Sequence, residues 1–230
     1  MIASSLTRSD LARDGQPFDV GKRRSWVYRG TRGVSHVVFS FLYRIEARVE
    51  EDLSLKGPAI ILPKHQYWTD IPIVSLVFRS FLYFMAKKEL FRYPGIRTYL
   101  SLLGGIPVDR KDSIRTLDSF RRFLTLLRAG EKIVVFPEGT YVRDGVGPGK
   151  SRLVQMVLRF QEESKRPIPF VPVGISYGRR VGWRRHVTVR VGSPLFAGDE
   201  ADAASLTDRI MEEISRLCCM PHCSPSDEAL

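Results

Sequence analysis

Cysteine is scarce in this sequence: there are three among 230 residues, Cys218, Cys219 and Cys223, all near the C-terminus. An odd number of closely spaced cysteines favours free thiols. The first sixteen residues lack the apolar core of a secretory signal, so we expect a reducing compartment. No second group of ligands accompanies this cluster, which is therefore a poor zinc site, and we expect no metal.

Long apolar runs are also missing. A spanning helix needs about 20 mostly apolar residues. The longest candidate, residues 71–86, is interrupted by Pro72 and Arg79, so we expect no such helix. The sequence has no internal repeats and no low-complexity linker. With 43% hydrophobic residues, a chain of 230 residues suits one large domain with a substantial core.

Acidic residues are too few to balance the basic ones. The 25 Asp and Glu residues face 36 Lys and Arg, which leaves a net charge of +11 and a pI near 9.9. This surplus indicates an anionic membrane, a nucleic acid or an anionic substrate as partner. Residues 179–190 hold five arginines and no acid. Zinc-finger spacing and RNA-recognition signatures are missing, so we expect no nucleic acid, although a salt-sensitive nucleic-acid binder stays an alternative.

The N-terminal region carries apolar residues at helical spacing. They are Val34, Val37, Val38, Phe41, Leu42, Ile45 and Val49. This pattern, interspersed with arginines and aromatic residues, predicts an amphipathic helix over residues 34–50. Such a helix either lies in the bilayer interface or packs on the protein's own core, and the sequence leaves both open.

Strand and helix patterns alternate through the rest of the chain. We expect strands at residues 58–62, 82–86, 105–108, 132–136, 168–176 and 186–191. We expect helices at residues 69–79, 94–103, 113–129, 151–164 and 203–217. This alternation predicts an α/β fold with a mainly parallel mixed sheet flanked by helices, to which the N-terminal helix is attached. We divide the chain into an N-terminal arm and helix (1–50), an α/β domain (51–217) and a tail (218–230).

A histidine and an aspartate five residues apart, His65 and Asp70, directly follow the apolar run at residues 59–62. A neutral imidazole can take a proton from a hydroxyl near neutral pH, and it does so best when a carboxylate orients its other nitrogen. Five residues span about 140° around a helix, so the two side chains would not share a helical face. We therefore expect His65 in the strand-to-helix turn and Asp70 in the first turn of the helix, reaching back. Taken alone, the pair also fits a turn histidine and a helix-capping acid.

Two further polar segments follow apolar runs. Residues 104–110 combine a glycine pair with Arg110, whose guanidinium can donate two hydrogen bonds to a phosphate. Residues 136–140 end a strand at Pro137 and place Glu138, Gly139 and Thr140 in a turn where N–H groups can approach a ligand. Each segment taken alone also fits an ordinary strand-ending turn.

The three segments, with the later strand at residues 170–175, resemble the glycerolipid acyltransferase family, which acylates glycerol 3-phosphate, lysophosphatidate and other lysophospholipids. All four family boxes occur in order between residues 57 and 192. The resemblance implies that His65 is the general base and Asp70 its orienting partner. It implies that Arg110 binds the acceptor phosphate, while Glu138, Gly139 and Thr140 shape the acceptor pocket.

Two positions depart from the family pattern. Lys64 stands where the family often has asparagine, and Tyr141 stands where an arginine is common. We expect Arg143 and Lys150 to supply the missing positive charge. The segment at residues 144–151 looks like a nucleotide-binding loop, but Asp144 occupies the position of the first required glycine, so we read it as a glycine-rich flap.

The resemblance implies transfer of a fatty acyl group from acyl-CoA or acyl-carrier protein to lysophosphatidate, without a cofactor. It implies an enzyme that acts as a peripheral or monotopic protein on the cytoplasmic face of an anionic membrane. The alternatives are glycerol 3-phosphate or another lysophospholipid as acceptor, and a catalytically inactive membrane-binding module.

Overall fold

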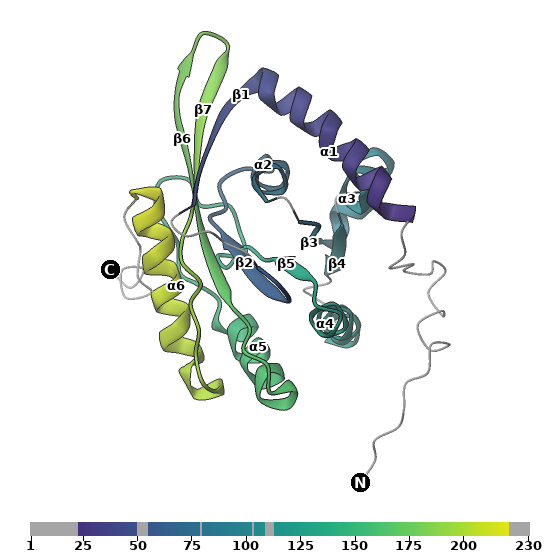
Figure 1. Ribbon diagram of the computed structural model, residues 1–230, viewed down its shortest axis with the longest axis vertical. Coiled ribbons are helices and arrows are strands. Elements are labelled where there is room, and N and C mark those ends of the chain that lie inside the picture. The colour runs from purple at the N-terminus through teal and green to yellow at the C-terminus, as the bar shows by residue number, and fades with distance from the viewer. Residues whose placement is uncertain (1–22, 50–54, 79, 103, 109–112, 221–230) are drawn as a thin grey trace.

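The computed structural model describes residues 23–49, 55–78, 80–102, 104–108 and 113–220. Its centre is a seven-stranded sheet in the order β1-β7-β6-β2-β5-β3-β4 (Figure 1). The strands are β1 (Tyr43–Val49), β2 (Ala59–Pro63), β3 (Leu82–Lys87), β4 (Gly105–Val108), β5 (Lys132–Val134), β6 (Phe170–Val181) and β7 (Arg184–Val191). Every neighbouring pair is parallel except β6 and β7, which confirms the predicted mainly parallel mixed sheet.

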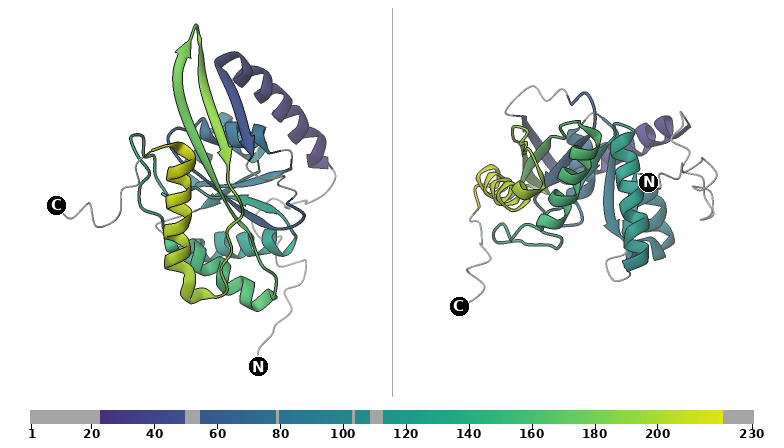
Figure 2. Two further views of the ribbon diagram at one scale, coloured as in Figure 1. Left: turned by 60° about the vertical axis from the view of Figure 1, so that its left-hand side comes forward. Right: turned by 90° about the horizontal axis from the view of Figure 1, so that it is seen from below.

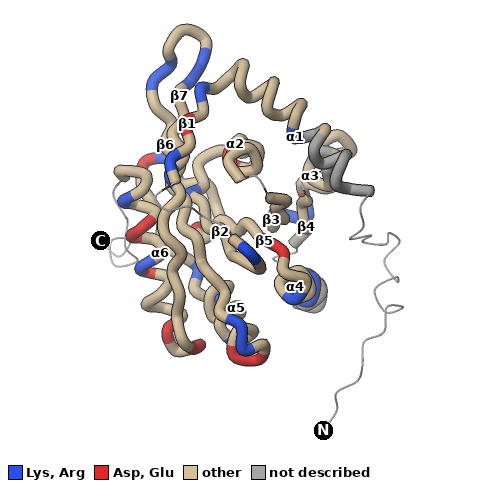
Figure 3. Tube along the Cα trace, in the orientation of Figure 1, with Lys and Arg blue, Asp and Glu red and all other residues tan. Residues whose placement is uncertain are grey.

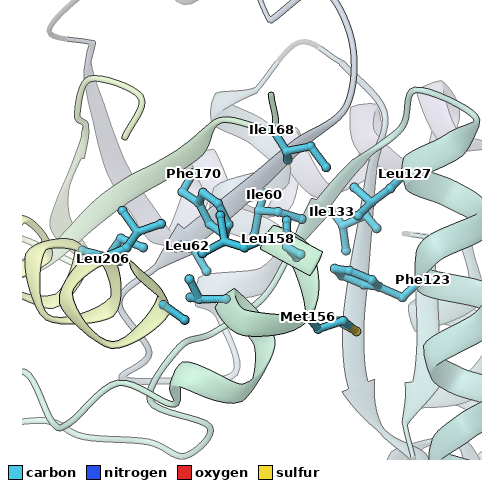
Figure 4. Packing of buried hydrophobic residues seen from close by; sticks show 14 of the residues in the cluster. Ile60, Leu62, Phe123, Leu127, Ile133, Met156, Leu158, Ile168, Phe170 and Leu206 are labelled. Carbon is cyan, nitrogen blue, oxygen red and sulfur yellow. The ribbon is translucent and has the colours of Figure 1, made fainter. Parts of the chain in front are cut away.

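Helices cover both faces of this sheet. They are α1 (Arg23–Leu42), α2 (Asp70–Val77), α3 (Pro94–Leu102), α4 (Ser113–Arg128), α5 (Ser151–Ser164) and α6 (Ala203–Cys218), with short 3-10 turns η2 (Lys88–Arg92) and η3 (Glu200–Asp202). Because strand side chains alternate between faces, Ile60 and Leu62 pack with α4, α5 and α6 (Figure 4), whereas Ile61 packs with α1 and α2. The central strand β2 is fully buried, as its continuous apolar run requires.

The N-terminal helix was predicted wrongly in its second half. The helix ends at Leu42, and Tyr43–Val49 forms the edge strand β1, which pairs in parallel with β7. Tyr43, Ile45 and Val49 fit a period of two as well as helical spacing, so the sequence pattern was ambiguous. β1 occupies the edge of the sheet, and β7 lies next to it. The three-part division of the chain stays a prediction, although β1, within residues 1–50, belongs to the sheet.

The apolar stripe of α1 faces outward. Val34, Val37 and Phe41 are 66%, 70% and 65% exposed, whereas Phe39 is 5% exposed and packs on the core. Packing on the protein's own core therefore does not account for the stripe. Among the described residues, none of the helices combines the length and the apolar character needed to cross a bilayer.

The strands β6 and β7 extend further than expected and form a hairpin that projects beyond the sheet (Figure 2). The turn consists of Gly182 and Trp183, and Gly182 has a φ of +63°, a value that glycine adopts without strain. Gly178 is unfavourable in a strand, so the sequence pattern ended β6 too early. β5 is shorter than expected and ends at Val134.

Candidate active site

The candidate site lies at the carboxyl ends of the central strands, where open α/β sheets commonly bind ligands. His65 follows β2, and Asp70 is the first residue of α2. Nδ1 of His65 lies 3.0 Å from Oδ2 of Asp70, which confirms the predicted placement of the pair in the strand-to-helix turn. The backbone N–H groups of Gln66 and Tyr67 donate to the same oxygen at 2.6 and 2.8 Å, so Asp70 also shapes this turn.

Asp70 fixes the orientation of the His65 imidazole. A carboxylate can only accept hydrogen bonds, so the neutral ring that donates to Asp70 has its proton on Nδ1 and its lone pair on Nε2. Within the described part of the chain, Nε2 has no hydrogen-bond partner. The ring stacks on Phe136, with centroids 3.7 Å apart, and lies 4.3 Å from the ring of Tyr141. Partial burial and the nearby Asp70 raise the pKa of the Tyr141 hydroxyl above its usual value.

Glu138 is buried, and both of its oxygens have partners. Oε1 accepts from Nζ of Lys64 at 2.7 Å and from N–H of Gly147 at 2.8 Å, while Oε2 accepts from N–H of His65 at 3.0 Å. Lys64 is fully buried and also donates to the carbonyl of Val142 at 2.6 Å. The Lys64–Glu138 ion pair therefore ties the His65 turn to the segments that contain Glu138, Val142 and Gly147.

Tyr177, at the base of the β6–β7 hairpin, is a site residue that the sequence did not reveal. Its hydroxyl donates to Oδ1 of Asp70 at 2.5 Å and lies 2.8 Å from Oγ1 of Thr69. Burial and the adjacent Asp70 raise the pKa of this hydroxyl above its usual range, which keeps it protonated. Tyr177 is 107 residues from Asp70, and no local motif marks it.

Two arginines lie over aromatic rings beside the pair. The guanidinium carbon of Arg143 is 5.3 Å from the ring centre of Tyr67, and that of Arg185 is 5.8 Å from Tyr67 and 5.1 Å from Tyr177. Arg143 was expected near the site. Arg185 belongs to the arginine-rich segment at residues 179–190 and was not expected at the site. Cation–π contacts of this kind hold guanidinium groups in place. Arg185 also donates from Nε to the carbonyl of Gly178 at 3.1 Å.

The other residues that the sequence predicted for the site differ in exposure, and one of them lies outside the described part of the chain. Gly139 has a φ of +70°, and a Cβ built there would lie 2.8 Å from Nζ of Lys150, so the lysine amine covers this turn. Thr140 is exposed. Arg110 lies outside the described residues, just after β4. Within the described residues, the structure thus brings His65, Asp70, Glu138 and Arg143 around one turn, with Lys150 at Gly139.

Comparison with known proteins assigns the chain to a family. Residues 44–176 match the protein-family model described as Acyltransferase, which is more than half of the chain. The chain belongs to the acyltransferase family. The matched range includes β1 except its first residue, Tyr43, and it ends one residue before Tyr177.

Relatives of the family member described here carry lipid acyltransferase names. A chloroplastic 1-acyl-sn-glycerol-3-phosphate acyltransferase of Arabidopsis thaliana is 31% identical over 56% of this chain and 36% of its own length. The 1-acyl-sn-glycerol-3-phosphate acyltransferase of Bacillus subtilis is 25% identical over 83% of this chain and 96% of its own. The lyso-ornithine lipid O-acyltransferase of Rhizobium meliloti is 27% identical over 67% and 49%. The chain thus spans about a third of the Arabidopsis relative.

The fold has a solved counterpart. The crystal structure of the acyltransferase PlsC from Thermotoga maritima superposes with a TM-score of 0.60, at 22% identity, over 84% of this chain and 80% of that one. The likeness shows that the sheet and its helices form the α/β architecture of that acyltransferase.

Proposed function

We propose that this member of the acyltransferase family transfers a fatty acyl group from acyl-CoA or acyl-carrier protein to the free hydroxyl of 1-acylglycerol 3-phosphate, giving phosphatidate. The observation that carries the proposal is the His65–Asp70 pair, in which Nδ1 is held at 3.0 Å from the carboxylate. Among the described residues, no group forms a hydrogen bond with Nε2. The names of the Arabidopsis and Bacillus relatives support lysophosphatidate as the acceptor.

The reaction needs one base and no cofactor. Nε2 of His65 takes the proton of the acceptor hydroxyl as its oxygen attacks the thioester carbonyl carbon. Asp70 stabilises the imidazolium that forms. The tetrahedral intermediate then expels the thiolate, which takes the proton back from His65. One C–O bond forms, one C–S bond breaks, and the enzyme returns to its starting state.

Positive side chains near the pair would bind the acceptor phosphate. We assign this role to Arg143 and Lys150, together with the predicted Arg110. Arginine suits a phosphate because its planar fork donates two parallel hydrogen bonds. Gly139 and Thr140 would line the acceptor pocket. Glu138 would act indirectly, since its oxygens hold Lys64 and the N–H of His65.

The membrane surface would be the place of reaction. The exposed stripe of α1 and the net charge of +11 support binding to an anionic bilayer, on whose cytoplasmic face the chain would act as a peripheral or monotopic protein. In this proposal residues 1–50 contribute the membrane-facing helix, residues 51–217 the acyltransferase domain and residues 218–230 a tail.

Thiol release from acyl-CoA, with and without lysophosphatidate, tests the proposal. We expect acceptor-dependent release by the wild type and loss of at least about a hundredfold in His65→Ala, because general-base catalysis contributes at least that much. His186→Ala is the matched control, since His186 lies on β7 and pairs with Glu46 of β1. Equal release by the wild type and His65→Ala would contradict the assignment of the base.

A second acceptor has a specific observation in its favour. The Rhizobium relative is named for lyso-ornithine lipid, and Tyr141 replaces the arginine that is common in the family pattern. The assay should therefore include lyso-ornithine lipid, glycerol 3-phosphate and other lysophospholipids, with acyl-CoA and acyl-carrier-protein donors. Vesicle binding without turnover on any pair would identify an inactive membrane-binding module.

A further inference from the structure

The outer part of the β6–β7 hairpin stands clear of the sheet (Figures 1 and 2). β2 pairs with β6 only as far as Val173, and β1 begins its pairing with β7 at Arg185. Residues 179–184, the hairpin tip, therefore form part of a two-stranded ribbon, and two strands alone are only marginally stable in water. Because the projecting ribbon adds little to the stability of the fold, we looked to binding for its role.

The apex of the hairpin tip is apolar and exposed. Val181 is 77% exposed, and Trp183, at the second position of the turn, is 69% exposed. Trp183 stacks on Phe41 of α1 at 5.9 Å, and its indole N–H donates to the Phe41 carbonyl at 3.2 Å. Phe41 itself stays 65% exposed, so this contact leaves both rings largely open. It joins the apex and the exposed stripe of α1 into one apolar surface, of a kind that marks a binding site.

Positive charge lies directly behind this apex. Arg179 and Arg180 are exposed, and neither has an ion pair within the described residues. Arg180 stands directly opposite Arg185 in the strand pairing, and like charges in that position repel. The nearby acid Glu46 is already paired with Arg48 and His186. Figure 3 shows basic residues on both arms of the hairpin, so the tip carries a charge that an anionic partner would neutralise.

We propose that the hairpin tip inserts into the headgroup region of an anionic bilayer, beside α1. Indole and aliphatic groups at the apex with arginines behind them match the order of a membrane interface, where apolar groups reach the acyl chains and cations meet lipid phosphates. This proposal deepens the proposed function. Only the reason for membrane docking, access to a lipid substrate, rests on that function. At the hairpin base, Tyr177 donates to Asp70, and Arg185 lies over the ring of Tyr67. Docking of the tip would therefore bring the His65 turn to the lipid surface.

Sedimentation with vesicles tests the tip. We expect wild-type protein to bind phosphatidylcholine vesicles that contain phosphatidylglycerol more tightly than pure phosphatidylcholine vesicles. Trp183→Ala should weaken binding to the mixed vesicles at least about tenfold, because a large buried ring is lost. Arg179→Glu with Arg180→Glu should weaken it about thirtyfold or more. Unchanged binding in both variants would overturn the proposal.

Matched controls lie at the other end of the molecule. Phe196→Ala removes an exposed aromatic residue just after Leu195, which pairs with Phe170 at the far end of β6. Arg152→Glu with Arg159→Glu reverses two exposed charges on α5. Both controls should bind mixed vesicles within about twofold of wild type if the tip supplies the attraction. An equal loss in the controls would mean that overall charge, and not the hairpin tip, drives binding.

A spectroscopic test reports on the tip itself. Trp183 is the only tryptophan left in a variant that carries Trp26→Phe and Trp68→Phe. Its emission should shift to shorter wavelength on addition of the mixed vesicles, as an indole leaves water. The absence of a shift at saturating lipid would contradict insertion. A shift that instead follows protein concentration without lipid, together with dimers in sedimentation velocity, would identify a second copy of the chain as the occupant.

The hairpin proposal and the proposed function can fail separately. Vesicle binding in a His65→Ala background requires no turnover, so loss of binding on adding Trp183→Ala supports the tip even if no acyl transfer is found. Thiol release with a short-chain, water-soluble lysophosphatidate should be unchanged in Trp183→Ala. Equal loss of that release and of vesicle binding would show that the tryptophan serves the fold, and thermal unfolding would record the same defect.

Discussion

Among single residues, Asp70 has the most hydrogen bonds at the site, and Tyr177 is the donor farthest from it in sequence. Tyr177→Phe removes the bond to Oδ1 and leaves that buried oxygen with one donor fewer. A hydrogen bond to a charged group contributes about 1.5–3 kcal/mol, so we expect kcat to fall about tenfold or more. The KM for the lysolipid should change little, because Tyr177 is a positioning residue.

The split between kcat and KM separates this role from a purely structural one. Tyr43→Phe is a suitable control, since Tyr43 also contacts the Tyr177 ring but makes no side-chain bond to Asp70 among the described residues. Full activity in Tyr177→Phe would refute the positioning role.

Lys64 and Glu138 form a buried ion pair. Removing one of the two charges should lower the free energy of unfolding. Lys64→Met leaves Glu138 charged and without its cation in a water-poor site, which typically costs about 3–5 kcal/mol. We expect urea unfolding to show a loss of that size. Lys56→Met, at an exposed lysine, should change the free energy of unfolding by less than about 0.5 kcal/mol. A loss as small as the control's would mean that the pair is hydrated in solution.

The two described cysteines should differ in reactivity. Burial raises the pKa of the Cys218 thiol to about 12, whereas Cys219 is exposed. Since the thiolate is the reactive form, this pKa makes the thiolate fraction of Cys218 at pH 8 about a thousandfold smaller than that of an ordinary thiol. Alkylation followed by peptide mapping of the folded protein should modify Cys219 first. Comparable rates in the folded state would contradict the burial of Cys218.

At the scale of elements, α6 packs directly on β6 at Gly174. A Cβ at this position would lie 2.6 Å from backbone and side-chain atoms of Leu217, whereas one at Gly178 of the same strand meets nothing closer than 3.6 Å. Gly174→Ala should therefore cost about 1–3 kcal/mol through overpacking. Gly178→Ala should cost much less, and thermal unfolding of the two variants compares them. Equal stability would show that α6 moves away without penalty.

At the scale of the whole molecule, the hairpin end carries mainly basic residues, whereas acidic and basic residues are mixed toward the other end (Figure 3). We expect binding to anionic vesicles to weaken steeply as salt rises, because exposed charges are screened over about 8 Å near physiological ionic strength. Tryptophan emission in a salt titration measures this. A salt-independent affinity would mean that apolar burial alone holds the protein to lipid.

The sequence by itself determined the alternation of strands and helices and the His65–Asp70 pair. Periodicity within an element and spacing within one turn are local properties, so they can be read from neighbouring residues. The same reading failed at residues 43–49, where apolar spacing fitted a helix and a strand equally. Only pairing with β7, more than a hundred residues away, decided between them.

Only the tertiary structure decided which residues support the His65–Asp70 pair and which face of α1 is exposed. Lys64 meets Glu138 across 74 residues, and Tyr177 meets Asp70 across 107, so no local pattern could reveal either contact. The sequence left the α1 stripe open between core and membrane, and the structure turned it outward beside Trp183. The physical reason is the same in each case: burial and charge pairing depend on which distant segments the folded sheet brings together.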